Sequence, residues 1–135
     1  MDRLEALTPA ECLELLAHAC LGRVAFTERA LPAIRPVNYA LLGHQLVLRT
    51  DPQGLGKRLD GQVVAFEVDE IDAERGTGWS VVVLGTARLL RAPGELMRQA
   101  TVPLGTLAGE GHDAHVVVVP GQITGRRIRT ETGAV

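Results

Sequence analysis

The spacing of apolar positions along the chain changes from a helical to an extended period near Gly22. Thr8-Pro9-Ala10-Glu11 forms a capping box with proline at the first helical position, which predicts that a helix begins here. Its apolar face is supplied, up to an expected end at Gly22, by Leu13, Leu16, Ala17 and Cys20. After Gly22, Val24 and Phe26 alternate with more polar or smaller neighbours, which indicates a strand.

The remaining pattern is mainly that of strands. Further strands are expected over residues 31–42, 45–50, 63–68 and 79–90. Pro32 and Pro36 predict that the first of these lies at an edge or a bulge, because proline cannot donate to a ladder. A short helix is expected over about residues 54–60, another helix over residues 93–100, a glycine-rich loop over residues 105–111 and a basic segment over residues 121–129.

Two valine-rich runs, residues 81–84 and 116–119, are apolar at every position. An antiparallel strand with one face in water should alternate, so something must cover the second face of these strands. Because the chain has few helical residues, a homodimer is the expected cover.

An acidic stretch follows the predicted strand at residues 63–68. Alternation places Phe66 and Val68 inward, with Glu67 and Asp69 on the other face. The stretch from Glu67 to Glu74 is therefore expected to be a solvated strand end.

Composition limits the classes of function. A chain of 135 residues with 46% hydrophobic and 22% charged residues predicts one globular domain over residues 1–135. The net charge of -2 and the 3% aromatic content argue against a nucleic-acid partner.

No apolar run is long enough to span a membrane and the N-terminus does not resemble a signal peptide, so a cytoplasmic protein without a membrane partner is expected. Cys12 and Cys20 are expected to be reduced core residues, and the scattered histidines predict no metal site.

The segment from Arg49 to Arg58 gathers groups that bind anions. Arg49 offers a planar fork of donors, Thr50 a hydroxyl, and Lys57 is the only lysine of the chain. Gly54 and Gly56 permit unusual backbone angles before the predicted short helix. A phosphate site and an ordinary solvated loop both remain open on this segment alone.

Six segments, in this order, resemble the flavin-binding split-barrel family of pyridoxamine 5'-phosphate oxidase-like proteins. They are Gly22-Arg23-Val24-Ala25-Phe26, Pro36-Val37-Asn38-Tyr39, the segment from Arg49 to Lys57, Val64-Ala65-Phe66-Glu67-Val68-Asp69, residues 78–85, and Ile123-Thr124-Gly125-Arg126-Arg127. The resemblance covers most of the chain. It implies a six-stranded antiparallel split β-barrel, a homodimer, and FMN bound in two equivalent grooves between the subunits.

The resemblance also implies roles for ten residues. Pro36, Val37 and Asn38 would lie along the isoalloxazine ring, and Arg49, Thr50 and Lys57 would hold the phosphate. Trp79 and Ser80 would approach the same flavin from the other subunit, and Arg126 and Arg127 would close the site. Structural roles stay open beside these: Asn38 in a bulge, Trp79 in packing at the barrel end, and the two arginines in a solvated tail.

The function expected from this resemblance is an FMN-dependent oxidoreductase acting on a small conjugated substrate, such as a reduced nicotinamide or a nitroaromatic. In that class the flavin carries out the electron transfer while the protein binds and orients it. The alternative is a non-catalytic flavin binder, or a relative that uses F420 or haem. Haem is disfavoured because no histidine is expected in the groove, although His44, at a turn, stays open as a ligand. Relatives often carry an aromatic residue where this chain has residues 102–105, and no second phosphate site can be placed, so a vitamin B6 substrate is not expected.

Overall fold

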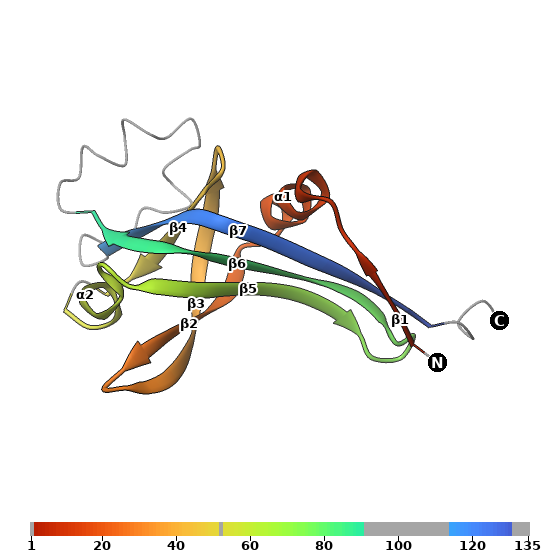
Figure 1. Ribbon diagram of the computed structural model, residues 1–135, viewed down its shortest axis with the longest axis horizontal. Helices are drawn as coiled ribbons and strands as arrows, with labels where there is room; N and C mark the ends of the chain where they lie inside the picture. The colour runs from red at the N-terminus through yellow and green to blue at the C-terminus, as the bar shows by residue number, and fades with distance from the viewer. Residues whose placement is uncertain (1, 52, 91–113, 131–135) are drawn as a thin grey trace.

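The computed structural model describes residues 2–51, 53–90 and 114–130, and its strands dominate the molecule (Figure 1). In chain order the elements are β1 (Asp2–Ala6), α1 (Pro9–His18), β2 (Leu21–Glu28), β3 (Leu31–Leu42), β4 (Gln45–Thr50), α2 (Leu55–Leu59), β5 (Val63–Asp72), β6 (Thr77–Leu89) and β7 (Ala114–Thr130). The helix expected over residues 93–100, the glycine-rich loop and residues 102–105 lie outside the described residues.

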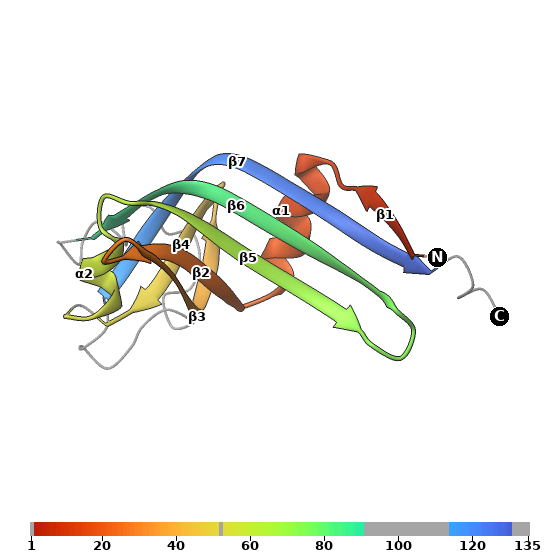
Figure 2. The ribbon, with the colours of Figure 1, turned by 60° about the horizontal axis from the view of Figure 1, so that its bottom comes forward.

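Six strands form a closed antiparallel ring. The strands follow the order β1-β7-β4-β3-β2-β5-β6, and β6 also pairs with β7, which joins the two ends. The strands β5, β6 and β7 run side by side as the longest part of the sheet (Figure 2). The predicted six-stranded antiparallel barrel is therefore confirmed.

The ring is split along one side of β7. The first part of β7 pairs with β4 from Ala114 to Val118, whereas its last part pairs with β1 from Arg126 to Thr130. The helix α1 packs beside the stretch of β7 between these two pairings (Figure 1). Strand β1, which the sequence analysis did not predict, thus extends the sheet beyond the split.

Helix α1 begins as predicted and ends earlier than predicted. The Thr8 hydroxyl accepts from the Glu11 N–H at 3.2 Å, and the Glu11 carboxylate accepts from the Thr8 N–H at 3.1 Å. The helix ends at His18, so Cys20 lies beyond it and is exposed, while Cys12 is buried. The expectation that both cysteines are core residues is wrong for Cys20.

Gly22 lies inside β2 and does not end the helix. A Cβ at this position would overlap Cζ of Phe66 and would stand 2.9 Å from the carbonyl oxygen of Glu67. Glycine is needed here because the neighbouring strand and the Phe66 ring approach the β2 backbone closely.

The interior of the ring is the core. Strand side chains that point inward include Val24, Phe66 and Val83, all fully buried. The rings of Tyr39 and Phe66 pack in a T-shaped arrangement with their centroids 4.9 Å apart, and the Tyr39 hydroxyl donates to the Leu16 carbonyl at 2.6 Å. Side chains on this side are called the inner face below, and those on the opposite side of the strands the outer face.

The two prolines of β3 lie where this strand has one free side. Residues 31–38 of β3 pair with β2, but pairing with β4 begins only at Asn38. Pro32 and Pro36 therefore lie where no β4 residue pairs with β3, so the missing N–H groups cost no hydrogen bond to β4. This confirms the edge predicted from their positions.

The two valine runs differ in how their outer faces are covered. Val82 is half-buried and Leu84 is 39% exposed, so the outer side of β6 stays open in this chain. Val117 is fully buried, because it packs with Leu42 and Val47 in a small cluster of its own. The expectation of a second copy therefore finds an open outer face on β6 only, because this chain itself covers Val117.

Candidate functional site

The first group of predicted site residues lies where β3, β4 and β7 run side by side. Asn38 stands directly opposite Arg49, and Arg49 stands opposite His115. Residues that are opposite each other in an antiparallel pair point to the same face, so these three side chains share the outer face. His115 was not assigned to this site, because the register that brings it beside Arg49 cannot be read from the sequence of β7.

Val37 and Thr50 point the other way. Both are buried, at 6% exposure each, and the Thr50 hydroxyl donates to the Ala114 carbonyl at 3.2 Å. Strand alternation therefore allows Pro36, Asn38 and Arg49 to reach a ligand on the outer face with their side chains, while Val37 and Thr50 stabilise the strands that carry them.

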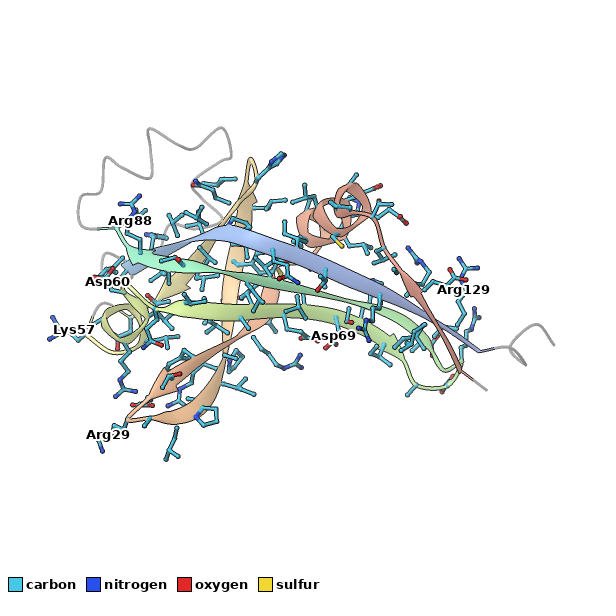
Figure 3. The ribbon with its side chains drawn as sticks, in the orientation of Figure 1. Arg29, Lys57, Asp60, Asp69, Arg88 and Arg129 are labelled. Atoms are coloured by element: carbon cyan, nitrogen blue, oxygen red, sulfur yellow. The ribbon has the colours of Figure 1, made fainter. Side chains whose placement is uncertain are left out.

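The loop after β4 is tightly folded and carries Lys57 on its surface. The Gly56 N–H donates to the Asp51 carbonyl at 3.0 Å, and a Cβ on Gly56 would stand 2.7 Å from the Thr50 hydroxyl oxygen. Lys57 is exposed and has no ion-pair partner among the residues that the structure describes; it extends away from the body of the protein (Figure 3).

Arg58 forms an ion pair with Glu28. Its guanidinium lies 2.8 Å from the Glu28 carboxylate. The two other cations of this segment, Arg49 on the outer face and Lys57 in the loop, are the ones that the resemblance assigned to the phosphate.

The second group of predicted site residues lies on β6 and β7. Ser80 stands opposite Arg126, and both belong to the outer face. Trp79 and Arg127 are also opposite each other but alternate to the inner side, where Trp79 packs against the core. Arg127 there lies near Glu11, whose pKa is lowered first by its hydrogen bonds with Thr8 and to a smaller degree by this positive charge. The packing role left open for Trp79 fits its position.

One copy of the chain does not bring the two groups together. Strands β2 and β5 lie between β3 and β6. At ~4.8 Å per strand spacing, β3 and β6 are therefore about 14 Å apart across the sheet. Figure 3 shows Lys57 at one end of the molecule and Asp69, the register partner of Ser80, well along the barrel from it.

A charged triad fills part of the outer face between the two groups. The Arg23 guanidinium nitrogen Nη1 lies 3.3 Å from the Glu67 carboxylate and 3.3 Å from the Asp69 carboxylate. Arg23 stands opposite Pro36 on one side and Glu67 on the other, and Asp69 stands opposite Ser80. The triad of Arg23, Glu67 and Asp69 thus joins the surroundings of Pro36 to those of Ser80.

Glu67 is not the solvated strand-end residue that the sequence predicted. Its pKa is raised to about 7, first by burial and then by the hydrogen bond with Asp69 and the repulsion from the Asp69 charge, while Arg23 partly lowers it. The acid spacing was visible in the sequence, but the pairing of β2 with β5, which places one arginine beside two carboxylates, was not.

A row of apolar side chains lies along one side of this triad. Ile34 on β3, Ala25 on β2, Ala65 on β5 and Leu84 on β6 form one continuous row across the outer face. Ile34 is 63% exposed. Beside Leu84, the bulge between β6 and β7 leaves a hollow of about 290 Å³, lined by Val63, Leu84, Gly85, Thr86, Val119, Gly121 and Gln122.

Two absences hold for the described part of the chain. No helix there is long and apolar enough to cross a membrane. No group of three or more histidine, cysteine or acidic side chains there can hold a metal ion.

Comparison with known proteins gives consistent matches. The family model described as pyridoxamine 5'-phosphate oxidase matches residues 8–127. An uncharacterised protein of Mycobacterium tuberculosis, Rv0080, is 39% identical over 124 residues, which cover 87% of this chain and 81% of that protein.

Solved structures share the fold. The FAD-binding protein from Mycobacterium smegmatis is 32% identical, with a TM-score of 0.70 over 93% of this chain and 98% of that one. An FAD-binding protein from Mesorhizobium loti has a TM-score of 0.74 at 21% identity, covering 92% of this chain and 97% of that one, and supports the fold alone.

Proposed function

The chain belongs to the pyridoxamine 5'-phosphate oxidase family, and we propose that it is a flavin-binding oxidoreductase that uses FMN and acts on a small conjugated molecule. The observation that carries this proposal is the placement of Asn38 opposite Arg49 on the outer face, beside the tight loop that presents Lys57. The 32%-identical relative that is described as an FAD-binding protein supports a flavin as the ligand.

The donors on this face fit a flavin phosphate. Arg49 and Lys57 supply two cations, and a guanidinium pairs well with phosphate oxygens. Thr50 donates to a carbonyl of its own chain, so its role is to hold the loop and not to bind phosphate. Arg58, paired with Glu28, has the same supporting role.

The ring would lie along Pro36 and Asn38. The amide of Asn38 offers both a donor and an acceptor to the polar edge of the ring. The flavin, when bound, supplies the two-electron chemistry, and the side chains of this face bind it, orient it and exclude water. FAD carries the same ring and a phosphate at the same place, so the segment from Asn38 to Lys57 would serve both cofactors.

A second copy of the chain would complete the site. Ser80 and Arg126 lie on β6 and β7, and β2, β5 and the triad separate them from Asn38 and Arg49; we propose that they reach the flavin of a partner. The exposed apolar row from Ile34 to Leu84 on the same face supports burial against that partner, because exposed apolar patches mark contact surfaces. This arrangement is a symmetric homodimer with two equivalent sites.

The test is cofactor binding followed by turnover. Purified protein is titrated with FMN, FAD, riboflavin and F420, and the bound flavin is then reduced anaerobically with a reduced nicotinamide and re-oxidised with a nitroaromatic. We expect FMN to bind most tightly and to cycle. Tighter binding of FAD or F420 than of FMN would change the cofactor, binding without turnover would make the protein a flavin carrier, and binding of none of them would refute the proposal.

A further inference from the structure

The triad of Arg23, Glu67 and Asp69 has one positive and two negative groups. Its side chains are partly accessible, at 58% for Arg23, 33% for Glu67 and 30% for Asp69. With both carboxylates ionised the triad has a net charge of minus one, and with one of them protonated it is neutral.

Among the residues that the structure describes, the strands paired with β5 place no further positive charge directly opposite Glu67. On one side, strand β2 contributes Arg23 of the triad itself; on the other, β6 contributes the uncharged Val82 and Ser80. Arg126 of β7 stands opposite Ser80 and is therefore one strand farther from the triad. A net negative charge on the triad is therefore balanced by solvent more than by protein.

Burial of this face would remove that solvent. The row of Ile34, Ala25, Ala65 and Leu84 lies directly beside the triad, so a partner that covers the apolar row also covers Glu67. Moving an uncompensated charge away from water is costly, whereas a neutral hydrogen-bonded triad is buried at much lower cost.

We propose that the triad of Arg23, Glu67 and Asp69 makes association of two copies of this chain pH-dependent, with each copy holding one proton on its carboxyl pair in the dimer. This rests on the homodimer proposed above, and it adds regulation to that site: a flavin site shared between copies would be complete at mildly acidic pH and would be weakened at alkaline pH.

The direction follows from proton linkage. The monomer binds this proton with a midpoint near neutral pH, since burial and Asp69 raise the pKa of Glu67 to about 7. If the dimer keeps the proton throughout, the free monomer loses it as the pH rises from about 6 to about 8. This loss weakens association about tenfold for each copy, and up to ~100-fold for the two copies together.

The experiment measures the dimer dissociation constant by analytical ultracentrifugation of the full chain, without flavin, at about pH 6 and about pH 8. Three proteins are compared: wild type, Glu67→Gln, and Glu70→Gln as a matched control on the same strand. Glu70 is exposed and alternates to the opposite face. We expect the dissociation constant to rise up to ~100-fold in wild type and Glu70→Gln, and to stay within about twofold in Glu67→Gln.

A second measurement does not depend on any variant. The side-chain carboxyl carbon of Glu67 in the wild-type protein should titrate by NMR with a midpoint near neutral pH, and an ordinary acidic midpoint would overturn the proposal. A dimer of constant strength, a dimer that tightens as pH rises, or equal pH dependence in wild type and Glu67→Gln would overturn the switch while leaving the homodimer intact. A wild-type monomer at both pH values would overturn the homodimer itself, and the switch with it.

Discussion

Asn38 and Arg49 lie directly opposite each other on β3 and β4, and both side chains belong to the outer face of the barrel. This pairing places a ring-binding amide and a phosphate-binding cation on one surface, within one strand spacing.

The first prediction concerns the phosphate. Arg49→Ala and Lys57→Ala should each weaken FMN binding by about 10- to 100-fold, because a charge-assisted contact contributes roughly 1.5 to 3 kcal/mol. Riboflavin has no phosphate and its affinity should hardly change. The measurement is a fluorescence titration of both flavins against each variant.

Arg58→Ala is the matched control for this prediction. Arg58 is adjacent to Lys57 in sequence but pairs with Glu28, so FMN affinity should be nearly unchanged. Equal losses for FMN and riboflavin, or a larger loss in Arg58→Ala than in Lys57→Ala, would place the phosphate elsewhere.

The second prediction separates the two roles left open for Trp79. Since its side chain alternates to the inner side and packs against the core, Trp79→Ala should lower the free energy of unfolding by about 2 kcal/mol, less than a fully buried tryptophan would. FMN affinity should change less than threefold when corrected for the folded fraction. Urea denaturation and a flavin titration on the same sample check both; a large affinity loss with unchanged stability would make Trp79 a ligand residue.

Much of this fold is local in origin and could be predicted. The capping box at Thr8 fixes where α1 begins, and the alternation of Val24 and Phe26 identifies β2 without reference to the rest of the chain. Strand β1 was missed because its five residues have neither a strong apolar period nor flanking turn residues, and only pairing with the end of β7 makes it a strand.

The site was less predictable because it depends on register. The sequence gives Pro36, Asn38 and Arg49 as candidates, but which face each side chain occupies follows from long-range pairing. A shift of one residue would exchange Arg49 with Thr50 on the outer face. For the same reason, neither the position of His115 nor the triad could be predicted: Arg23 on β2 lies more than forty residues before the two carboxylates on β5.

The third prediction tests how α1 seals the split in the barrel. Gly125 of β7 accepts a hydrogen bond from the Leu7 N–H at 2.9 Å, and a Cβ on Gly125 would stand 2.6 Å from the Cys12 sulfur. Gly125→Ala should therefore lower the free energy of unfolding by about 1 to 3 kcal/mol through overpacking.

A double-mutant cycle gives the check on that cause. Cys12→Ala removes the sulfur atom, so the Gly125→Ala substitution should cost less in a Cys12→Ala background than in wild type. If the losses of unfolding free energy in the two single variants add up to the loss in the double variant, the contact between Cys12 of α1 and position 125 is not the cause.

The fourth prediction is a pH dependence of stability that comes from Glu67. Its pKa is raised in the folded protein to about 7, so between its ordinary value of 4.5 and about 7 the folded state binds more protons than the unfolded state. Stability must therefore fall as pH rises through this window. The free energy of unfolding of the wild type should therefore fall relative to that of Glu67→Gln as pH rises. The change should be less than about 3 kcal/mol, because partial exposure of the side chain screens the effect.

Urea denaturation at a fixed, low protein concentration across this pH window measures that difference. The free energy of unfolding of Glu70→Gln should depend on pH in the same way as that of the wild type. A wild-type protein that gains stability relative to Glu67→Gln as pH rises would contradict the assignment of the raised pKa to Glu67.

The last prediction distinguishes the face that meets a second copy from a surface that the chain covers by itself. Val82 and Val117 occupy similar valine runs, but Val82 lies half-buried beside Glu67 on the open outer face, whereas Val117 is fully buried with Leu42 and Val47. Val82→Asp should give a folded monomer, because the new charge stays in water as long as no partner covers it. Val117→Asp should instead prevent folding, since an unpaired charge in that cluster costs several kcal/mol whether or not a partner is present. Circular dichroism and ultracentrifugation on both variants make the comparison, and a Val82→Asp protein that still dimerises like the wild type would move the interface away from β6.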